Sequence, residues 1–179
     1  MAVVGRRRVW LSWSSGKDSA FALSSLRRSA ETDVVGLLTT FDEAADRVAM
    51  HAVRRGLARE QARSCGLPLV EVDLPAACSN DEYERRVAAA LDRGRSTGVT
   101  HVAFGDLFLE DVRAYRERQV ARSGLEPLFP LWGRDTARLA RGMIEDGFRA
   151  IVTCVDPRRI SAAFAGRAFD DSLLDELPA

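Results

Sequence analysis

The chain has 179 residues and carries 26 basic and 26 acidic side chains, so its formal net charge is zero. That length suits one domain with one full core, and a composition of 46% hydrophobic and 29% charged residues excludes wholesale disorder. The balanced charge argues against a broad surface for nucleic acid or acidic membranes, which would need a basic excess.

Short apolar or β-branched runs alternate with helical patterns along the chain. The expected order is strand 8–13, helix 18–29, strand 34–41, helix 51–65, strand 67–74, helix 79–98, strand 100–105, helix 111–123, extended segment 128–131, helix 135–146 and strand 150–155. The acidic tail from Asp170 to Glu176 is read as a peripheral helix or a fraying end. Nearly continuous apolar strands separated by helices are typical of a parallel sheet covered on both faces. We therefore predict an α/β fold: a three-layer α/β/α sandwich with a mostly parallel, Rossmann-like sheet, in a single domain over 1–179.

Targeting and redox signals are weak. The arginines at 6–8 precede an apolar stretch that stops at Trp13, too short for a signal peptide, and no apolar run approaches the roughly 18 residues of a membrane span. Cys65, Cys78 and Cys154 are widely spaced and never form a C-x-x-C pair, which predicts reduced, mostly buried thiols without a disulfide framework or a zinc or iron–sulfur site. We expect a cytoplasmic protein.

The first predicted strand leads into Ser14-Ser15-Gly16-Lys17-Asp18-Ser19, where an open α/β sheet binds its ligands. The glycine permits close backbone approach, the following helix start favours an anion, and Lys17 is the only lysine in the chain. Leu11 and Asp18 occupy positions where a Walker A loop needs glycine and Ser or Thr, so this is not that motif. The loop predicts a phosphate or pyrophosphate site; the alternative is a solvated, N-capping turn.

The loop is similar to the S-G-G-K-D-S loop of the PP-loop ATP pyrophosphatases, which adenylate a carbonyl or carboxylate and release pyrophosphate. Four further segments, in the same order, resemble the diphthine–ammonia ligase branch: Met50-His51, Gly105-Asp106, Tyr115-Arg116 and Pro127-Leu128-Phe129-Pro130-Leu131-Trp132. The resemblance spans essentially the whole chain and implies a sheet of the adenine nucleotide α-hydrolase (HUP) type.

Two features depart from that family. Ser15 stands where the family usually has glycine, and we expect it to keep φ below zero. Members of the branch usually continue, past the position of Ala179, into a Gly-Glu-Tyr/Phe-x-Thr segment on the substrate side, so nucleotide binding carries over better than ligase activity.

The resemblance implies roles for the loop and for the second strand. Ser14, Ser15, Gly16, Lys17 and Ser19 would cradle phosphates, and Asp18 would orient the loop or hold Mg²⁺. The end of the second strand, namely Thr39, Thr40 and Phe41, would border the adenine.

Later segments carry further candidates, each with a structural alternative. Gly105 would admit the nucleotide and Asp106 would bind metal or a ribose hydroxyl, unless the pair is a turn with an N-capping aspartate. Arg116 would clamp a carboxylate or phosphate, or lie on the surface. His51 would contact the nucleotide or act as a base, with a pKa lowered by a helix N-terminus, or make a structural contact. Trp132 would wall a substrate pocket or belong to the core.

The two histidines are distant from each other in the sequence and the cysteines are unpaired, so we expect no transition metal bound by protein side chains. We interpret His101 as a structural residue. The leading hypothesis is an ATP-dependent adenylating enzyme of the diphthine–ammonia ligase type, with Lys17, Asp18, Asp106 and Arg116 as catalytic groups. Its reactants would be ATP with Mg²⁺, a small-molecule or protein-borne carboxylate, and ammonia, and a homo-oligomer is compatible with the sequence. The alternatives are a non-catalytic nucleotide-binding module and a tRNA-modifying PP-loop enzyme.

Overall fold

The computed structural model describes residues 5–178, and the chain divides into two compact units, with the boundary in the sequence between Trp132 and Gly133. We describe each unit by itself, and the single-domain organisation over 1–179 stays a prediction. The first unit contains β1 (Arg7–Ser12), α1 (Lys17–Arg28), β2 (Thr32–Asp42), β3 (Arg47–Val48), α2 (Arg55–Ser64), β4 (Leu69–Leu74), α3 (Asn80–Ser96), β5 (His101–Ala103), α4 (Glu110–Arg122) and β6 (Glu126–Leu128). The second contains α5 (Thr136–Glu145), the 3₁₀ turn η1 (Ala162–Phe164) and α6 (Asp171–Glu176).

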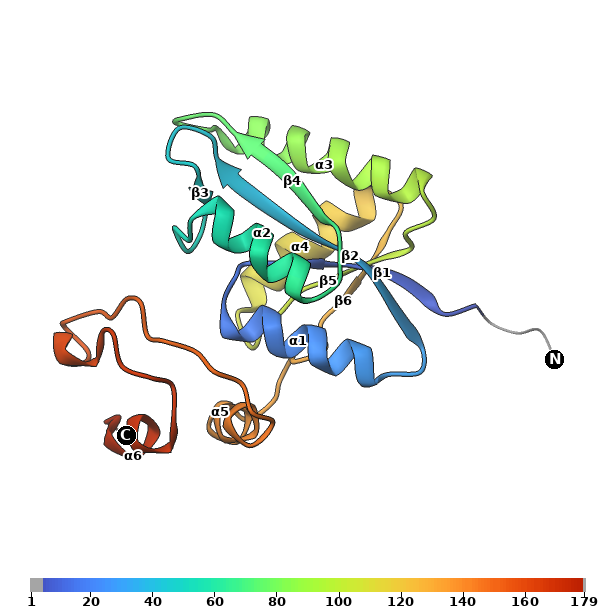
Figure 1. The fold of residues 1–179 in the computed structure, drawn as a ribbon. Helices are drawn as coiled ribbons and strands as arrows, with labels where there is room; N and C mark the ends of the chain where they lie inside the picture. The colour runs from blue at the N-terminus through green and yellow to red at the C-terminus, as the bar shows by residue number, and fades with distance from the viewer. Residues whose placement is uncertain (1–4, 179) are drawn as a thin grey trace. The chain divides into compact units, whose positions relative to one another are not determined.

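The first unit is built on a mostly parallel sheet, which confirms the predicted α/β class. The strand order is β3-β2-β1-β5-β6, with β4 pairing on β2, and only the short β3 runs antiparallel to its neighbour. In Figure 1, α3 lies along one face of this sheet and α1 and α2 lie on the other. The arrangement is consistent with the Rossmann-like, HUP-type sheet that the sequence predicts.

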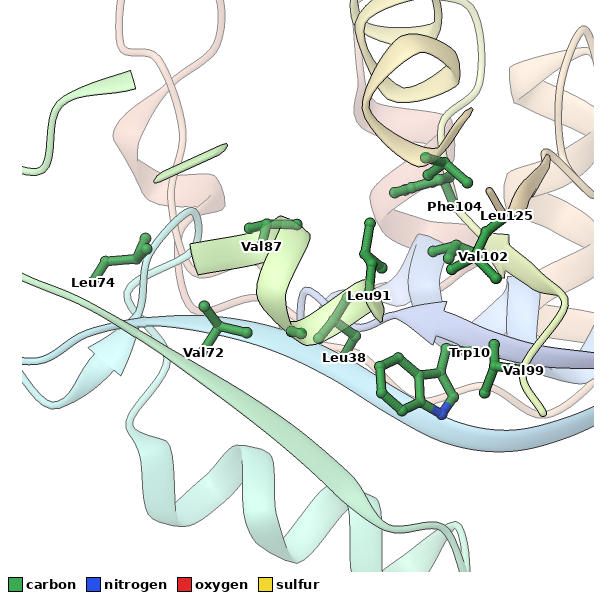
Figure 2. Close-up of a cluster of buried hydrophobic side chains, with 12 residues drawn as sticks. Trp10, Leu38, Val72, Leu74, Val87, Leu91, Val99, Val102, Phe104 and Leu125 are labelled. Carbon is green, nitrogen blue, oxygen red and sulfur yellow. The ribbon is translucent and has the colours of Figure 1, made fainter. Parts of the chain in front are cut away.

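Alternation along the strands assigns side chains to the two faces. Leu38 and Val72 point toward Val87 and Leu91 of α3, in a cluster that includes the indole of Trp10 (Figure 2). On the other face, the fully buried Phe41 packs against Ala58 of α2. Two consecutive residues of a strand therefore pack into the helical layers on opposite faces of the sheet.

Most predicted helices appear within two residues of their expected ends, with one correction. The helix expected at 51–65 begins only at Arg55, because the small antiparallel strand β3 and the turn after it occupy 47–54. Ser79 caps α3 as predicted, since its side chain accepts a hydrogen bond from the Glu82 N–H at 3.2 Å. The tail forms the short helix α6.

The strand predicted at 150–155 is wrong. Of residues 150–155 only Ile151 forms a β-bridge, antiparallel to Ala168, and the flanking backbone bonds join Val152 to 166–167 and Ala150 to Phe169. The apolar run pairs locally with a later segment, and a periodicity argument cannot see which partner a short run will take. The expected burial of the thiols also fails for Cys154, which is exposed, whereas Cys65 and Cys78 are partly buried.

Between residues 5 and 178, no helix combines the length and the apolar character needed to cross a membrane.

Helix α2 is anchored to the sheet through one arginine. Arg55, with a side chain only 10% exposed, forms ion pairs with Glu71 at 2.8 Å and Asp73 at 2.6 Å on β4, and with Asp46 at 2.7 Å in the loop before β3. Its guanidinium carbon also lies 4.2 Å from the centre of the Phe41 ring. These contacts fix the start of α2 against β2 and β4.

This network predicts an acid-sensitive fold. Hydrogen bonds from Arg59 and then Arg55 hold the pKa of Glu71 below its ordinary value of 4.5, despite the burial that opposes them. A lowered folded-state pKa contributes stability above the ordinary pKa and loses it as pH falls through the folded-state value. We expect the free energy of unfolding, measured by urea denaturation, to fall below pH 4.5 and to fall less in Glu71→Gln. An equal fall in both proteins would contradict this assignment.

Candidate nucleotide-binding site

The predicted phosphate loop lies at the point in the sheet where the order of successive strands reverses. β1 is flanked by β2 on one side and β5 on the other, which makes the β1–β5 boundary the place where open α/β sheets bind ligands. Trp13, directly after β1, is held on its backbone: its N–H donates to Leu38 O and its carbonyl accepts from Thr39 Oγ1, both at 2.8 Å. The chain thus leaves the sheet at a fixed position.

The loop is closed by hydrogen bonds among its serines and glycine. Ser14 Oγ donates to Ser19 Oγ at 3.2 Å, Ser19 Oγ donates to Gly16 O at 2.9 Å, and Gly16 N–H approaches Ser14 Oγ at 3.4 Å. Gly16 is the N-cap of α1 and supplies no side-chain cap. The first-turn amides of α1 are therefore available to an anion, and they carry the positive end of the helix dipole.

Lys17 and Asp18 form an ion pair at the start of α1. Lys17 Nζ lies 2.7 Å from Asp18 Oδ1, and each side chain is 37% exposed. Asp18 thus contacts the lysine directly, and both groups remain accessible from solvent.

Ser15 does not follow its prediction. Its φ is +66°, in the left-handed region, where a side chain costs about 1–2 kcal/mol relative to glycine. Its hydroxyl oxygen is buried and has no hydrogen-bond partner among the described residues. The loop therefore has, at a serine, the left-handed backbone conformation that glycine adopts most readily.

Gly105 follows β5 and packs against the first turn of α1. A Cβ at this position would lie 3.0 Å from the backbone C and O of Asp18 and 3.1 Å from Ser19 N. Glycine is required here for the approach of two backbone segments, so this glycine already has a structural reason for its presence.

Asp106 and Arg116 face each other beside that contact. Arg116 Nε and Asp106 Oδ2 are 3.7 Å apart, and neither atom has a hydrogen-bond partner within the described part of the chain. Burial raises the pKa of Asp106, with an opposing contribution from the positive charge of Arg116. The guanidinium also lies 4.9 Å from the centre of the Phe104 ring. Arg116 is therefore a half-buried cation and not a surface residue.

A cavity opens from the loop between the sheet and the helices α3 and α4. It has a volume of about 70 Å³, and its polar lining includes Ser12, Ser14 and Thr40. Arg116 is the one charged side chain among its described lining residues, and Gln119 is beside it. The interior is apolar, with Leu38, Val87, Leu91, Val102 and Val120.

The three residues expected to border the adenine do not share a face. Thr40 lines the cavity, whereas Thr39 is buried and bonded to Trp13, and Phe41 is buried in the α2 layer. The two-residue period of a strand separates them, so only Thr40 has access to the cavity.

Met50 and His51 lie in the turn before α2. Met50 lines the cavity and is 78% exposed. His51 Nε2 would lie 4.0 Å from a Cβ placed on Gly16, so its ring lies over the loop, but it is not at a helix N-terminus. His51 is therefore not placed to interact with the dipole of α2. His101 contacts Thr100 Oγ1 through Nδ1 and Glu126 through Nε2.

Tyr115 and Trp132 stand behind the cavity wall. The Tyr115 hydroxyl accepts a hydrogen bond from Gln119 Nε2 at 3.2 Å. The ring of Trp132 meets Phe129 edge-on at 6.0 Å, and Phe129 stacks on Phe104, which lines the cavity. Trp132 is thus separated from the cavity by two rings.

Two site residues were missed from the sequence. Gln61 of α2 contacts both Trp13 and Ser15, and Trp13 lines the cavity. Gln61 lies far from the loop in sequence, and a single glutamine in an amphipathic helix carries no signal of a specific contact.

Within residues 5–178, no three His, Cys, Asp or Glu side chains gather as a metal-binding cluster. Asp18 and Asp106 are the carboxylates next to the loop, and each already faces a cation.

Comparison with known proteins identifies the family. Residues 7–127, more than half of the chain, match the family described as diphthamide synthase N-terminal domain; the match ends before the Phe129–Trp132 part of the proline-rich motif. No curated protein matches the chain. The position of the loop after β1 and of the cavity beside it agrees with this match. The chain belongs to the diphthamide synthase N-terminal domain family, a family of PP-loop, ATP-utilising pyrophosphatases.

Proposed function

We propose that the protein is an ATP-dependent ligase that cleaves ATP to AMP and pyrophosphate and thereby activates a carboxylate or carbonyl for attack by ammonia. The main support is that a single cavity is lined by Ser14 of the phosphate loop and by one cation, Arg116. The phosphate loop and the cation proposed to bind the acceptor anion therefore border the same cavity. We also propose a cytoplasmic location.

The reaction divides into two displacements. An acceptor carboxylate oxygen attacks the α-phosphorus, the bond from that phosphorus to the bridging oxygen breaks, and pyrophosphate leaves. Ammonia then attacks the acyl carbon, loses a proton, and expels AMP. Both steps gain most from fixed positions and from charges placed where negative charge develops.

The proposed residue roles follow from location. Lys17 and the first-turn amides of α1 bind the phosphates, and Ser14, Gly16 and Ser19 keep the loop in shape. Thr40 borders the adenine from the cavity rim.

The remaining roles concern the acceptor and the metal. Arg116 binds the acceptor carboxylate, oriented by Asp106. Mg²⁺ bound with the nucleotide would neutralise pyrophosphate charge, and Asp18 and Asp106 would hold it.

Product analysis tests the proposal. The protein is incubated with ATP, Mg²⁺, ammonium and a panel of carboxylates, and AMP and pyrophosphate are measured. We expect equal amounts of both, formed only with an accepted carboxylate, and Arg116→Met should raise the KM of that carboxylate about 30-fold or more, because a charged hydrogen-bonded pair contributes about 2 kcal/mol. The dissociation constant of ATP should change little.

Other outcomes identify the alternatives. Nucleotide binding without pyrophosphate release across the panel would indicate a non-catalytic module. Pyrophosphate release that depends on tRNA would indicate a tRNA-modifying enzyme, and ADP with phosphate would contradict the proposed chemistry.

A further inference from the structure

We propose that Gln61 is a positioning residue for the phosphate loop: its side-chain amide connects the Trp13 indole to the Ser15 carbonyl and holds the left-handed turn at Ser15. This inference rests on the proposed binding of nucleotide phosphates by the loop. It assigns to α2 a function that neither the loop motif nor the cavity lining contains.

The contact has only one chemically consistent orientation. Trp13 Nε1 donates to Gln61 Oε1 at 3.1 Å, and Gln61 Nε2 donates to Ser15 O at 3.4 Å. An indole nitrogen only donates and a backbone carbonyl only accepts, so the amide must direct its oxygen to the first and its nitrogen to the second.

Ser15 needs support that its own loop does not supply. Side-chain hydrogen bonds within the loop join Ser14, Gly16 and Ser19 to one another and Lys17 to Asp18. The hydroxyl of Ser15 is buried without a partner in the described chain. A non-glycine residue at φ +66° persists where its surroundings over-determine the backbone. The Gln61 amide is the side chain that reaches the backbone of Ser15.

The direction of the Ser15 carbonyl matters for an anion. The peptide between Ser15 and Gly16 is planar and trans, so a carbonyl turned toward Gln61 turns the Gly16 N–H the opposite way. That N–H points into the loop, toward Ser14 Oγ. Holding the carbonyl therefore holds the Gly16 N–H toward Ser14 Oγ, and with it the shape of the loop that leads into the phosphate-binding amides of α1.

Helix α2 holds the Gln61 amide in a fixed position. Arg55 is bonded to β4 and to the loop before β3, and Gln61 follows six residues later, roughly 9 Å along the helix axis. The position of Gln61 over the end of β1 is thereby set by the sheet.

The test is a double-mutant cycle between Gln61→Met and Ser15→Gly, with Mg²⁺–ATP and adenosine affinities measured by calorimetry and competition. Gln61→Met should weaken ATP binding about tenfold, the effect of one lost hydrogen bond, and leave adenosine binding unchanged. Glycine adopts the left-handed conformation unaided, so in the Ser15→Gly background the same substitution should cost less than about threefold.

Equal losses in both backgrounds, or equal losses for ATP and adenosine, would overturn the inference, because a merely structural role of Gln61 gives those results. Glu60→Gln, at an exposed position of the same helix, serves as the matched control and should bind ATP like the unmodified protein. If Gln61→Met does not fold, Gln61→Glu keeps the bond from Trp13 and loses the donor to Ser15, and its added charge cancels across the cycle.

A Lys17→Ala variant separates failure of this inference from failure of the proposed function. If Lys17→Ala leaves ATP binding intact, the proposed function itself fails. If Lys17→Ala weakens ATP binding and Gln61→Met does not, only the positioning role of Gln61 fails.

Discussion

Substitution of Lys17 by alanine is expected to weaken Mg²⁺–ATP binding by about 30- to 100-fold, because a charge-assisted contact to phosphate contributes about 2–3 kcal/mol. The same change releases Asp18 from its 2.7 Å ion pair and leaves a carboxylate at the start of the helix, where it opposes a phosphate. Calorimetric titration measures the effect. Arg28→Ala removes one charge from the other end of α1 and should leave the affinity almost unchanged.

The composition offers an independent readout for the same residue. Lys17 is the only lysine in the chain, so an amine-specific acylating reagent has two targets, its Nζ and the α-amino group. ATP with Mg²⁺ should protect Lys17 and leave the α-amino group reactive, as followed by peptide mass analysis. Equal labelling of Lys17 with and without nucleotide would place the phosphates elsewhere.

Substitution of Gly105 by alanine is expected to lower both stability and nucleotide affinity. The new Cβ would lie 3.0 Å from the backbone of Asp18, so the first turn of α1 must move by several tenths of an ångström. Overpacking of this kind costs about 1–3 kcal/mol, and here the displaced atoms include the amides proposed to bind phosphate. Denaturant unfolding and calorimetry give the two effects separately.

Gly94→Ala is the matched control for this prediction. A Cβ on Gly94 would lie 2.7 Å from the Trp10 ring, in the α3 layer. It should destabilise the fold to a similar degree and leave the ATP affinity of the folded protein unchanged. If Gly105→Ala behaves like Gly94→Ala in both measurements, the first turn of α1 does not depend on the close approach of Gly105.

The class of fold and the location of the loop were predictable because both depend on local patterns. Apolar runs separated by amphipathic segments specify strands and helices, and parallel strands place their exits at one edge of the sheet. The loop sequence, its single lysine and its place after β1 follow from the chain alone. The strand predicted at 150–155 failed because a short apolar run does not carry the identity of its partner, and Ile151 pairs with Ala168 instead.

The roles of individual residues depended on contacts between distant segments. Strand alternation separates Thr40 from Thr39 and Phe41, and the start of α2 at Arg55 removes His51 from the helix dipole. Gly105, which the sequence suggested would admit the nucleotide, is needed for close packing against α1.

The sequence by itself determined an α/β chain, a PP-loop after its first strand and a family with ATP chemistry, because residue spacing encodes secondary structure and short motifs encode phosphate loops. Only the tertiary structure decided how that loop is held: by Gln61 on α2, by Gly105 after β5 and by a left-handed Ser15. The physical reason is that these contacts join segments 40 or more residues apart, and the preference of any one residue for such a contact becomes visible only when the sheet brings both ends together.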